Sequence, residues 1–229
     1  EKRKFILTMR TVVSYNKEND RSHGGSSMKD MPTKERILYS ALDLFSEKGY
    51  DGVGVDLIAE NAGLKGPSLY RHYKGKEDIF SSLIDMVESH YTKGFGLKNT
   101  EVGFPESIDD LIENAMGRIQ FTMHDDVIRK TRRILAMEQF RSERMAEMTT
   151  RYHLENLQEL YAIIFADMMK KGILKQDDPE YLALEFVSPV TLLIHIYDRQ
   201  PEREAEVLEK IRKHFEHFVK TYGEEESAC

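Results

Sequence analysis

The chain has 229 residues, of which 40% are apolar and 32% charged, and its formal net charge at neutral pH is −7. This is an ordinary globular composition, long enough for two small domains or one elongated one. The acidity excludes a protein that binds nucleic acid over its whole surface, and no apolar run approaches the ~20 residues needed to cross a bilayer.

Residues 1–30 show no apolar periodicity and include a run rich in Asn, Asp, Ser and Gly, so we expect a disordered extension or a cloning remnant. They carry seven basic and four acidic side chains, which leaves a net charge of −10 on residues 31–229. The functional alternative is a basic arm that touches DNA. The single cysteine, Cys229, cannot form a disulfide within the chain, which favours a reducing, cytoplasmic setting.

From residue 33 onward, apolar residues recur at three- and four-residue spacing, which predicts helices nearly throughout. We find no alternating run bounded by turn residues, so we expect no strand, and the predicted fold class is all-α. The expected helices of the N-terminal part are one capped by Thr33 and ended by Gly49, a short one stopped by Gly63, one from about Pro67 to Tyr73, and a longer one opened by Lys76.

Residues 94–103 have the composition of a linker, and the helical pattern then resumes on a longer scale. The expected helices are Ser107 to Met123, Asp126 to Phe140, Ser142 to Lys171, one opened by Pro179, and a last one from Pro201 to Tyr222. We expect Pro189 to kink the helix that contains it, because proline removes one backbone hydrogen bond.

Residues 62–78 concentrate positive charge on an otherwise acidic chain. The basic side chains of this segment are Lys65, Arg71, His72, Lys74 and Lys76, and no acidic residue interrupts them before Glu77. Two short helices around a glycine turn are typical of a helix-turn-helix, whose second helix lies in DNA. Because neutralised phosphates supply most of the non-specific affinity for DNA, the segment predicts a DNA-binding protein.

An ordered set of residues over positions 33–80 resembles the TetR/AcrR-type bacterial transcriptional regulators. The set is Ala41, Phe45, Gly49–Tyr50, Ile58–Ala59, Ala62–Gly63, Ser68–Leu69–Tyr70, His72–Tyr73 and Lys76–Glu77. The resemblance implies a helix-turn-helix DNA-binding domain over residues 31–78 and a helical ligand-binding and dimerisation domain over residues 79–229. It also implies a homodimer in which the last two helices of each subunit form a four-helix bundle.

The chain departs from the family pattern at two helix N-termini. Where similar regulators carry Thr and then Ser or Thr as caps, this chain has Gly54 and Lys65. Glycine is a weaker cap than threonine by a few tenths of a kcal/mol, and a lysine side chain cannot cap. We therefore expect Pro67 to contribute more to the start of the second helix.

The expected DNA-binding residues lie along the outward side of the second helix and its flanks. They are Lys65, Gly66, Pro67, Ser68, Tyr70, Arg71, His72, Lys74 and Lys76. Leu69 and Tyr73, four residues apart, are expected to face inward. Ala62 and Gly63 are expected where the two helices cross closely.

Individual roles follow from side-chain chemistry. Arg71 is the best candidate for a bidentate contact with guanine, Ser68 for a hydrogen bond to a base, and Pro67 for packing on a thymine methyl group. The resemblance implies phosphate contacts by the residues Tyr70, His72 and Lys76, whereas charge alone suggests them for Lys65 and Lys74. The alternatives are that Arg71 binds phosphate and that Tyr70 and His72 are ordinary surface residues.

Polar groups set among apolar ones in the C-terminal part are the natural lining of an effector pocket. The candidates are Tyr152, Tyr161, Phe165, Ser188, Thr191 and His195, with Met116, Ile119 and Met168 as an apolar wall. The Met, Tyr and Phe content favours an apolar or aromatic small-molecule effector. The alternative for each residue is plain core or dimer interface, and His195 in particular fits a buried, hydrogen-bonded histidine.

We find no Ser/His/Asp set, phosphate-binding loop or paired-carboxylate motif, so we expect no enzyme and no cofactor. His214 and His217 lie three apart without a third ligand, so we expect no metal site. The leading hypothesis is a homodimeric repressor that binds a palindromic double-stranded DNA operator and is released by a small-molecule effector. The alternative is a DNA-bound scaffold of the same fold that responds to a protein partner.

Overall fold

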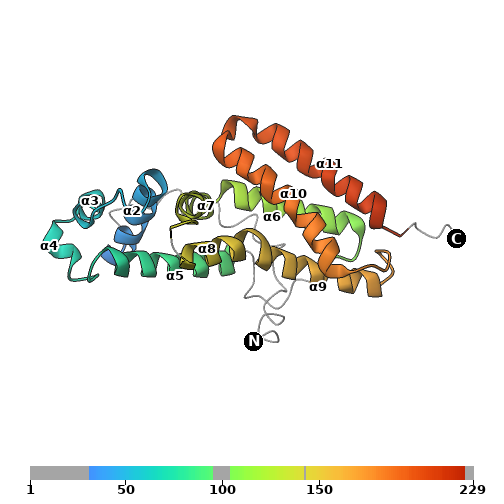
Figure 1. Ribbon diagram of the computed structural model, residues 1–229, viewed down its shortest axis with the longest axis horizontal. Coiled ribbons are helices and arrows are strands. Elements are labelled where there is room, and N and C mark those ends of the chain that lie inside the picture. The colour runs from blue at the N-terminus through green and yellow to red at the C-terminus, as the bar shows by residue number, and fades with distance from the viewer. Residues whose placement is uncertain (1–30, 95–103, 142, 225–229) are drawn as a thin grey trace. The chain divides into compact units, whose positions relative to one another are not determined.

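The computed structural model describes residues 31–94, 104–141 and 143–224 (Figure 1). Within these ranges every regular element is a helix, apart from one isolated antiparallel bridge between Leu174 and Gly223. The predicted all-α class is confirmed. The extension predicted at residues 1–30 and almost all of the linker predicted at 94–103 lie outside the described residues. None of the described helices combines the length and the apolar composition needed to cross a membrane.

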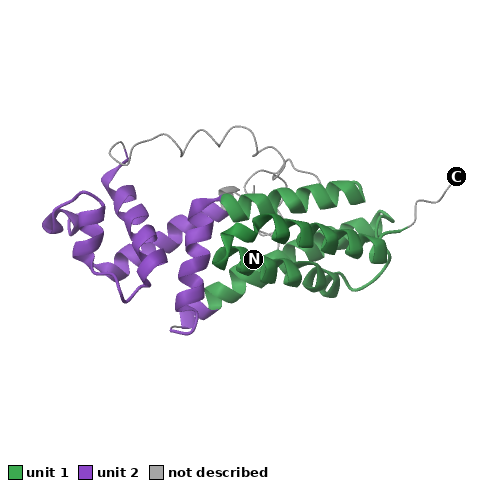
Figure 2. Ribbon diagram, turned by 90° about the horizontal axis from the view of Figure 1, so that it is seen from above, with its two compact units in different colours: residues 1–12, 97–124, 147–229 green, residues 13–96, 125–146 purple. Residues whose placement is uncertain are grey.

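The chain divides into two compact units (Figure 2). Of the described residues, unit 2 contains 31–94, 125–141 and 143–146, and unit 1 contains 104–124 and 147–224. Unit 2 therefore joins the N-terminal helices to a segment some thirty residues further along the chain. The domain boundary expected at residue 78 falls inside unit 2. The division into a DNA-binding and a ligand-binding domain at this residue remains a prediction.

The described residues of unit 2 form five helices and the start of a sixth. They are α2 (Thr33–Lys48), α3 (Val55–Asn61), α4 (Gly66–Leu69), α5 (Lys76–Gly94) and α7 (Asp126–Glu138), with α8 (Glu143–Thr150) beginning there. Helix α2 buries Ile37, Ala41 and Phe45 at helical spacing, and this face forms the centre of the core. Val127 and Ile134 of α7 belong to the same core, which explains why α7 packs with the N-terminal helices.

The ends of α2 follow from proline and glycine geometry. Pro32, rather than the expected Thr33, is the N-cap, and its carbonyl accepts the Arg36 N–H at 3.1 Å. The expectation for Thr33 was wrong by one residue, because Pro32 itself has the non-helical geometry of a cap, with φ −52° and ψ 141°, and Thr33 is already the first residue of the helix. Gly49 ends the helix with φ 72°, and its N–H donates to the Phe45 carbonyl at 3.0 Å.

The turn after α3 depends on backbone conformation, not on close helix packing. Gly63 has φ 67°, and a Cβ added there would meet nothing within 4 Å. Its N–H donates to Glu60 at 2.9 Å and the Leu64 N–H donates to Ala59 at 2.8 Å, which closes a glycine-type helix end. The expectation of a tight crossing at Gly63 was therefore wrong, whereas Ala62 is buried as expected.

Unit 1 is a bundle around an aromatic core. Its elements are α6 (Ile108–His124), the end of α8, a π-helical turn η3 (Arg151–Glu155), α9 (Asn156–Lys170), α10 (Pro179–Arg199), a 3₁₀ turn η4 (Pro201–Arg203) and α11 (Glu204–Tyr222). Helices α10 and α11 pack side by side (Figure 1). Phe186 of α10 stacks on Phe215 of α11 with ring centroids 4.3 Å apart, and Phe165 of α9 meets it edge-on at 5.3 Å.

The long helix expected from Ser142 to Lys171 is interrupted. The π-helical turn η3 separates α8 from α9, and the Thr191 hydroxyl of α10 donates to the His153 carbonyl of that turn at 3.0 Å. A π turn frees carbonyls from the regular ladder, so a donor on a neighbouring helix can stabilise it. Local periodicity does not reveal this interruption, because both flanking segments are helical.

Candidate nucleic-acid interface

Two buried side chains attach the second helix of the expected helix-turn-helix to the core of unit 2. Leu69 is fully buried and Tyr73 is 4% exposed, as predicted. Burial raises the pKa of Tyr73, so its phenol stays protonated, and it donates a long hydrogen bond to the Lys34 carbonyl at 3.4 Å. The α-helical part of α4 is shorter than expected, because the Leu69 carbonyl also accepts the His72 N–H at 2.8 Å in a tighter final turn.

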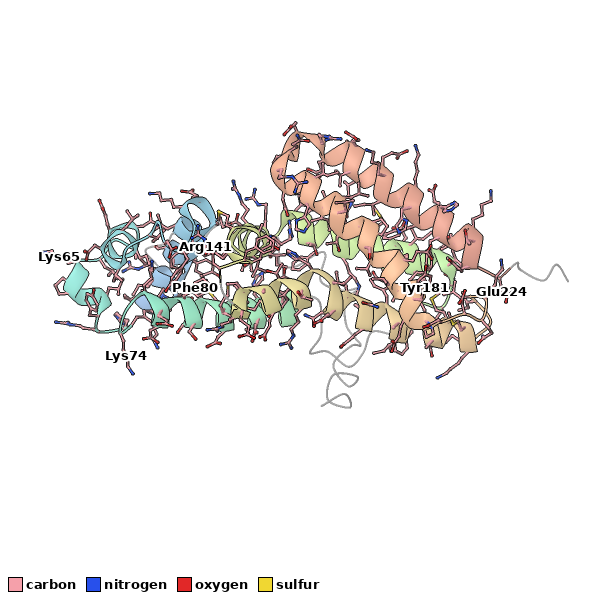
Figure 3. All side chains as sticks on the ribbon, viewed as in Figure 1. Lys65, Lys74, Phe80, Arg141, Tyr181 and Glu224 are labelled. Atoms are coloured by element: carbon pink, nitrogen blue, oxygen red, sulfur yellow. The ribbon has the colours of Figure 1, made fainter. Side chains whose placement is uncertain are left out.

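We call the residues around α4 the recognition surface: Lys65, Gly66, Pro67, Ser68, Tyr70, Arg71, His72, Lys74 and Lys76. Five of them are exposed, namely Lys65, Pro67, Tyr70, Arg71 and Lys74, and the other four are partly buried. Figure 3 shows Lys65 and Lys74 projecting outward on either side of α4. No side chain caps α3 at Gly54 or α4 at Lys65, as predicted from their chemistry.

Most cations of the recognition surface have no acidic partner among the described residues. No ion pair engages Lys65, Arg71 or Lys74 in the part of the chain that the structure describes. The Asp78 carboxylate is occupied at the start of α5, where it accepts the backbone N–H of Lys74 at 2.8 Å. The recognition surface therefore offers positive charge to an external anion.

Lys76 differs from the other lysines. Its Nζ donates to the Tyr50 carbonyl at 2.8 Å and lies 4.1 Å from the centroid of the Tyr50 ring. This ring packs against Phe45 at 5.4 Å and Phe80 at 4.9 Å. The Lys76 ammonium therefore holds the connection between α2 and α3 in place, with its remaining N–H groups available to another acceptor.

Glu138 supports the same connection from α7 and was not predicted from the sequence. Its carboxylate is buried, and Oε1 accepts the Tyr50 N–H at 3.0 Å. The sequence does contain a signal: Glu138 follows Ile134 by four residues, which places a carboxylate on the apolar face of α7. Nearby, the exposed Arg141 donates to Asp51 at 2.8 Å.

The residues expected to line an effector pocket all belong to unit 1 but differ in how far they are buried. Met116, Ile119, Tyr161, Phe165 and Met168 are buried in its apolar core. Tyr152, Thr191 and His195 are partly buried, and the His195 ring meets the His153 ring edge-on at 4.8 Å.

Ser188 is exposed, and its hydroxyl donates to the Leu184 carbonyl of its own helix at 2.7 Å. The prediction that Ser188 lines a pocket was therefore wrong, because this residue lies on the outer face of α10. The stripe of α11, with Val207, Ile211, Phe215 and Phe218, is buried within its own unit rather than left for a second subunit.

Among the described residues, no group of three or more His, Cys, Asp or Glu side chains is arranged to hold a metal ion. His214 instead lies with Nε2 3.0 Å from the Phe186 carbonyl, and His217 is exposed.

Comparisons with known proteins agree with this geometry. Residues 37–83 match the family described as bacterial regulatory proteins, tetR family. The chain is 27% identical over 126 residues to the biofilm operon icaADBC HTH-type negative transcriptional regulator IcaR of Staphylococcus epidermidis, a match that covers 42% of this chain and 68% of that protein. The Staphylococcus aureus IcaR is 43% identical over 51 residues, which span 22% of this chain and 27% of that protein.

Solved structures extend the similarity of fold beyond the N-terminal helices. SmeT, the repressor of the Stenotrophomonas maltophilia multidrug efflux pump SmeDEF, is 18% identical with a TM-score of 0.62, over 87% of this chain and 94% of that one. The SmeT–triclosan complex is 19% identical with a TM-score of 0.65, over 84% of this chain and 92% of that one. At these identities the similarity establishes the fold alone.

Proposed function

Since the chain belongs to the tetR family of bacterial regulatory proteins, we propose that it is a homodimeric repressor released from a palindromic operator by a small apolar or aromatic effector. Members of this family regulate transcription and are not enzymes. The observation that carries the proposal is the recognition surface, a cluster of cations without ion pairs to the described residues on a chain of net charge −7. Operator DNA lies in the bacterial cytoplasm, and we propose that compartment for the protein.

We assign the recognition of the DNA base sequence to Arg71. Its guanidinium is exposed beside α4, without an ion pair among the described residues, and its planar fork matches the O6 and N7 acceptors of guanine. Ser68 and Pro67 are proposed to contact neighbouring bases. Lys65 and Lys74, both exposed, are proposed to bind phosphates.

Tyr70, His72 and Lys76 complete the proposed contacts with the DNA backbone. Tyr70 itself is 56% exposed, so its hydroxyl is free to reach the DNA backbone, and His72 follows on the same turn. Lys76 is proposed to contact phosphate through the N–H groups that Tyr50 does not occupy. These contacts fix the position of the protein on the duplex, whereas Arg71 supplies sequence information.

Dimerisation is assigned to the outer face of α10. Tyr181 is 60% and Leu192 63% exposed, and Glu185 and Ser188 lie exposed between them at helical spacing. Large apolar side chains on one exposed helical face favour contact with a second subunit. A two-fold dimer would place two recognition helices about 34–36 Å apart, one turn of DNA.

The effector is proposed to bind in the interior of unit 1, near Tyr161 and Phe165. Two observations support this: the core there is rich in aromatic side chains, and SmeT, which shares the fold, forms a complex with triclosan. The effector would release DNA by binding more tightly to a conformation whose recognition helices no longer match the operator spacing.

The test is binding to the DNA that flanks the gene of this protein, measured at two salt concentrations. We expect salt-sensitive, nanomolar protection of one palindrome by the wild type, and a loss of discrimination of about 1–3 kcal/mol with Arg71→Ala. The matched control is Arg133→Ala, which removes an exposed arginine from α7. Weak protection of all sequences, unchanged by Arg71→Ala, would contradict sequence reading by this residue.

A second candidate function is a DNA-bound scaffold that responds to a protein partner. The observation in its favour is Phe140, which is 92% exposed just after α7, with Met137 40% exposed nearby. A regulatory partner that uses this patch would lose binding with Phe140→Asp, while binding of operator DNA and of the effector would be unchanged.

A further inference from the structure

Arg118 of α6 carries a guanidinium that forms no ion pair with the described residues. Its Nη1 is sealed from solvent and has no hydrogen-bond partner among the described residues. The residue as a whole keeps partial exposure, so the guanidinium lies under the surface of unit 1 rather than in its centre. Buried polar groups are almost always hydrogen-bonded, so an orphaned N–H of a charged group requires an explanation.

Several acidic side chains of α6, α9 and α10 have other partners among the described residues. On α6, Asp110 accepts the Glu106 N–H at 3.3 Å and Glu113 faces Arg212 at 3.8 Å. On α9, Asp167 pairs with Lys171 at 2.9 Å. On α10, Glu185 accepts the Tyr222 hydroxyl at 2.6 Å.

Arg118 nevertheless keeps its charge. Burial lowers the pKa of its guanidinium and the phenol of Tyr161 opposes that effect, but arginine starts from so high a pKa that it stays protonated. Tyr161 comes from α9 and is itself buried, with its ring centroid 4.7 Å from that of Phe186 and 5.8 Å from that of Phe165. A cation and a phenol close enough to influence each other's pKa therefore lie in unit 1, with the phenol against an aromatic wall.

We propose that Arg118 binds the carboxylate of an aromatic or aliphatic acid, whose apolar part packs against Tyr161 and the aromatic core. A guanidinium forms two parallel hydrogen bonds with a carboxylate, and such charge-assisted bonds strengthen when water is excluded. The inference rests on the proposed effector site and narrows its ligand from any apolar compound to an apolar acid. Neither Arg118 nor an acidic effector was expected from the sequence.

In the absence of such a ligand, the unpartnered guanidinium would lower the free energy of unfolding of the protein. Removing a buried charge that lacks a partner is often neutral or stabilising when an apolar side chain of similar size replaces it. We therefore expect Arg118→Met to melt at the same temperature as the wild type or higher. A clearly lower melting temperature would show that Arg118 is structural and would overturn the proposal.

The direct test compares acids with their neutral amides in the absence of DNA. The probes are 2-naphthoate against 2-naphthamide and decanoate against decanamide, with affinity measured by calorimetry on the full chain. We expect the wild type to bind at least one acid about tenfold more tightly than its amide. Arg118→Met should lose that preference, Arg118→Lys should keep part of it, and Arg199→Met, which removes an exposed arginine of α10, should keep all of it.

The possible outcomes separate this inference from the proposed function. Equal binding of acid and amide in both pairs, or no binding of either acid, overturns the carboxylate site while leaving operator binding and its release by a neutral compound intact. A preference for the acid that depends on Arg118 supports the site even if the protein fails to protect DNA, in which case the proposed repressor function is the part that fails.

Discussion

Two residues of the recognition surface that look alike in the sequence differ in exposure and in their contacts. Lys74 and Lys76 lie two apart, and both were expected to bind phosphate. Only Lys74 is exposed, whereas the Lys76 ammonium is bonded to the Tyr50 carbonyl and lies over the Tyr50 ring. The outward positions of Arg71 and Tyr70 were predictable from helical periodicity, because these positions depend on local geometry.

The two lysines give a matched prediction at this scale. Lys76→Met should lower the free energy of unfolding by about 1 kcal/mol, because it removes a charge-assisted hydrogen bond and a cation–π contact. Lys74→Met should leave stability unchanged and reduce the salt slope of DNA binding by about one counterion. Urea unfolding and DNA titrations over a range of salt would measure both effects. Equal stability of the two variants would contradict the structural role of Lys76.

Among the elements, α7 is the one whose place was hardest to predict. It follows α6 directly along the chain but packs in unit 2, where Val127 and Ile134 join the core of the N-terminal helices. Two polar contacts tie its C-terminal end to the connection between α2 and α3. One is buried, from the Tyr50 N–H to Glu138, and the other is exposed, from Arg141 to Asp51.

We expect these two contacts to differ in strength. Glu138→Ala should lower the free energy of unfolding by about 1–3 kcal/mol, because the Tyr50 N–H loses its acceptor in a buried place. Asp51→Ala should cost about 0.5 kcal/mol or less, since exposed ion pairs contribute little. Thermal or denaturant unfolding distinguishes them, and comparable losses in the two variants would show that burial does not set the strength of these contacts.

At the scale of the whole molecule, the proposed homodimer needs a surface that joins two subunits. The apolar stripe of α11 was expected to contribute, but it is buried inside its own unit, so we propose the face of α10 that exposes Tyr181 and Leu192. Leu192 is the most exposed apolar residue of that face at 63%.

Leu192→Asp should convert the protein to a monomer, because it places two like charges in the proposed interface, and should weaken operator binding. Phe140→Asp is the control, since it removes a residue that is still more exposed at 92% but lies in unit 2. Sedimentation equilibrium measures the outcome. A Leu192→Asp protein that remains dimeric would assign dimerisation to another surface, and a monomeric wild type would exclude the dimer.

The helices and the outward side of the proposed DNA-binding segment follow from the sequence by itself, because periodicity, proline and glycine act over a few residues. The tertiary structure alone decided the rest: the π turn within the expected long helix, the exposure of Ser188, the sealed Nη1 of Arg118, and the bond from Tyr50 to Glu138, which joins residues 88 positions apart. Such features depend on which distant helices meet, and no local pattern encodes that choice.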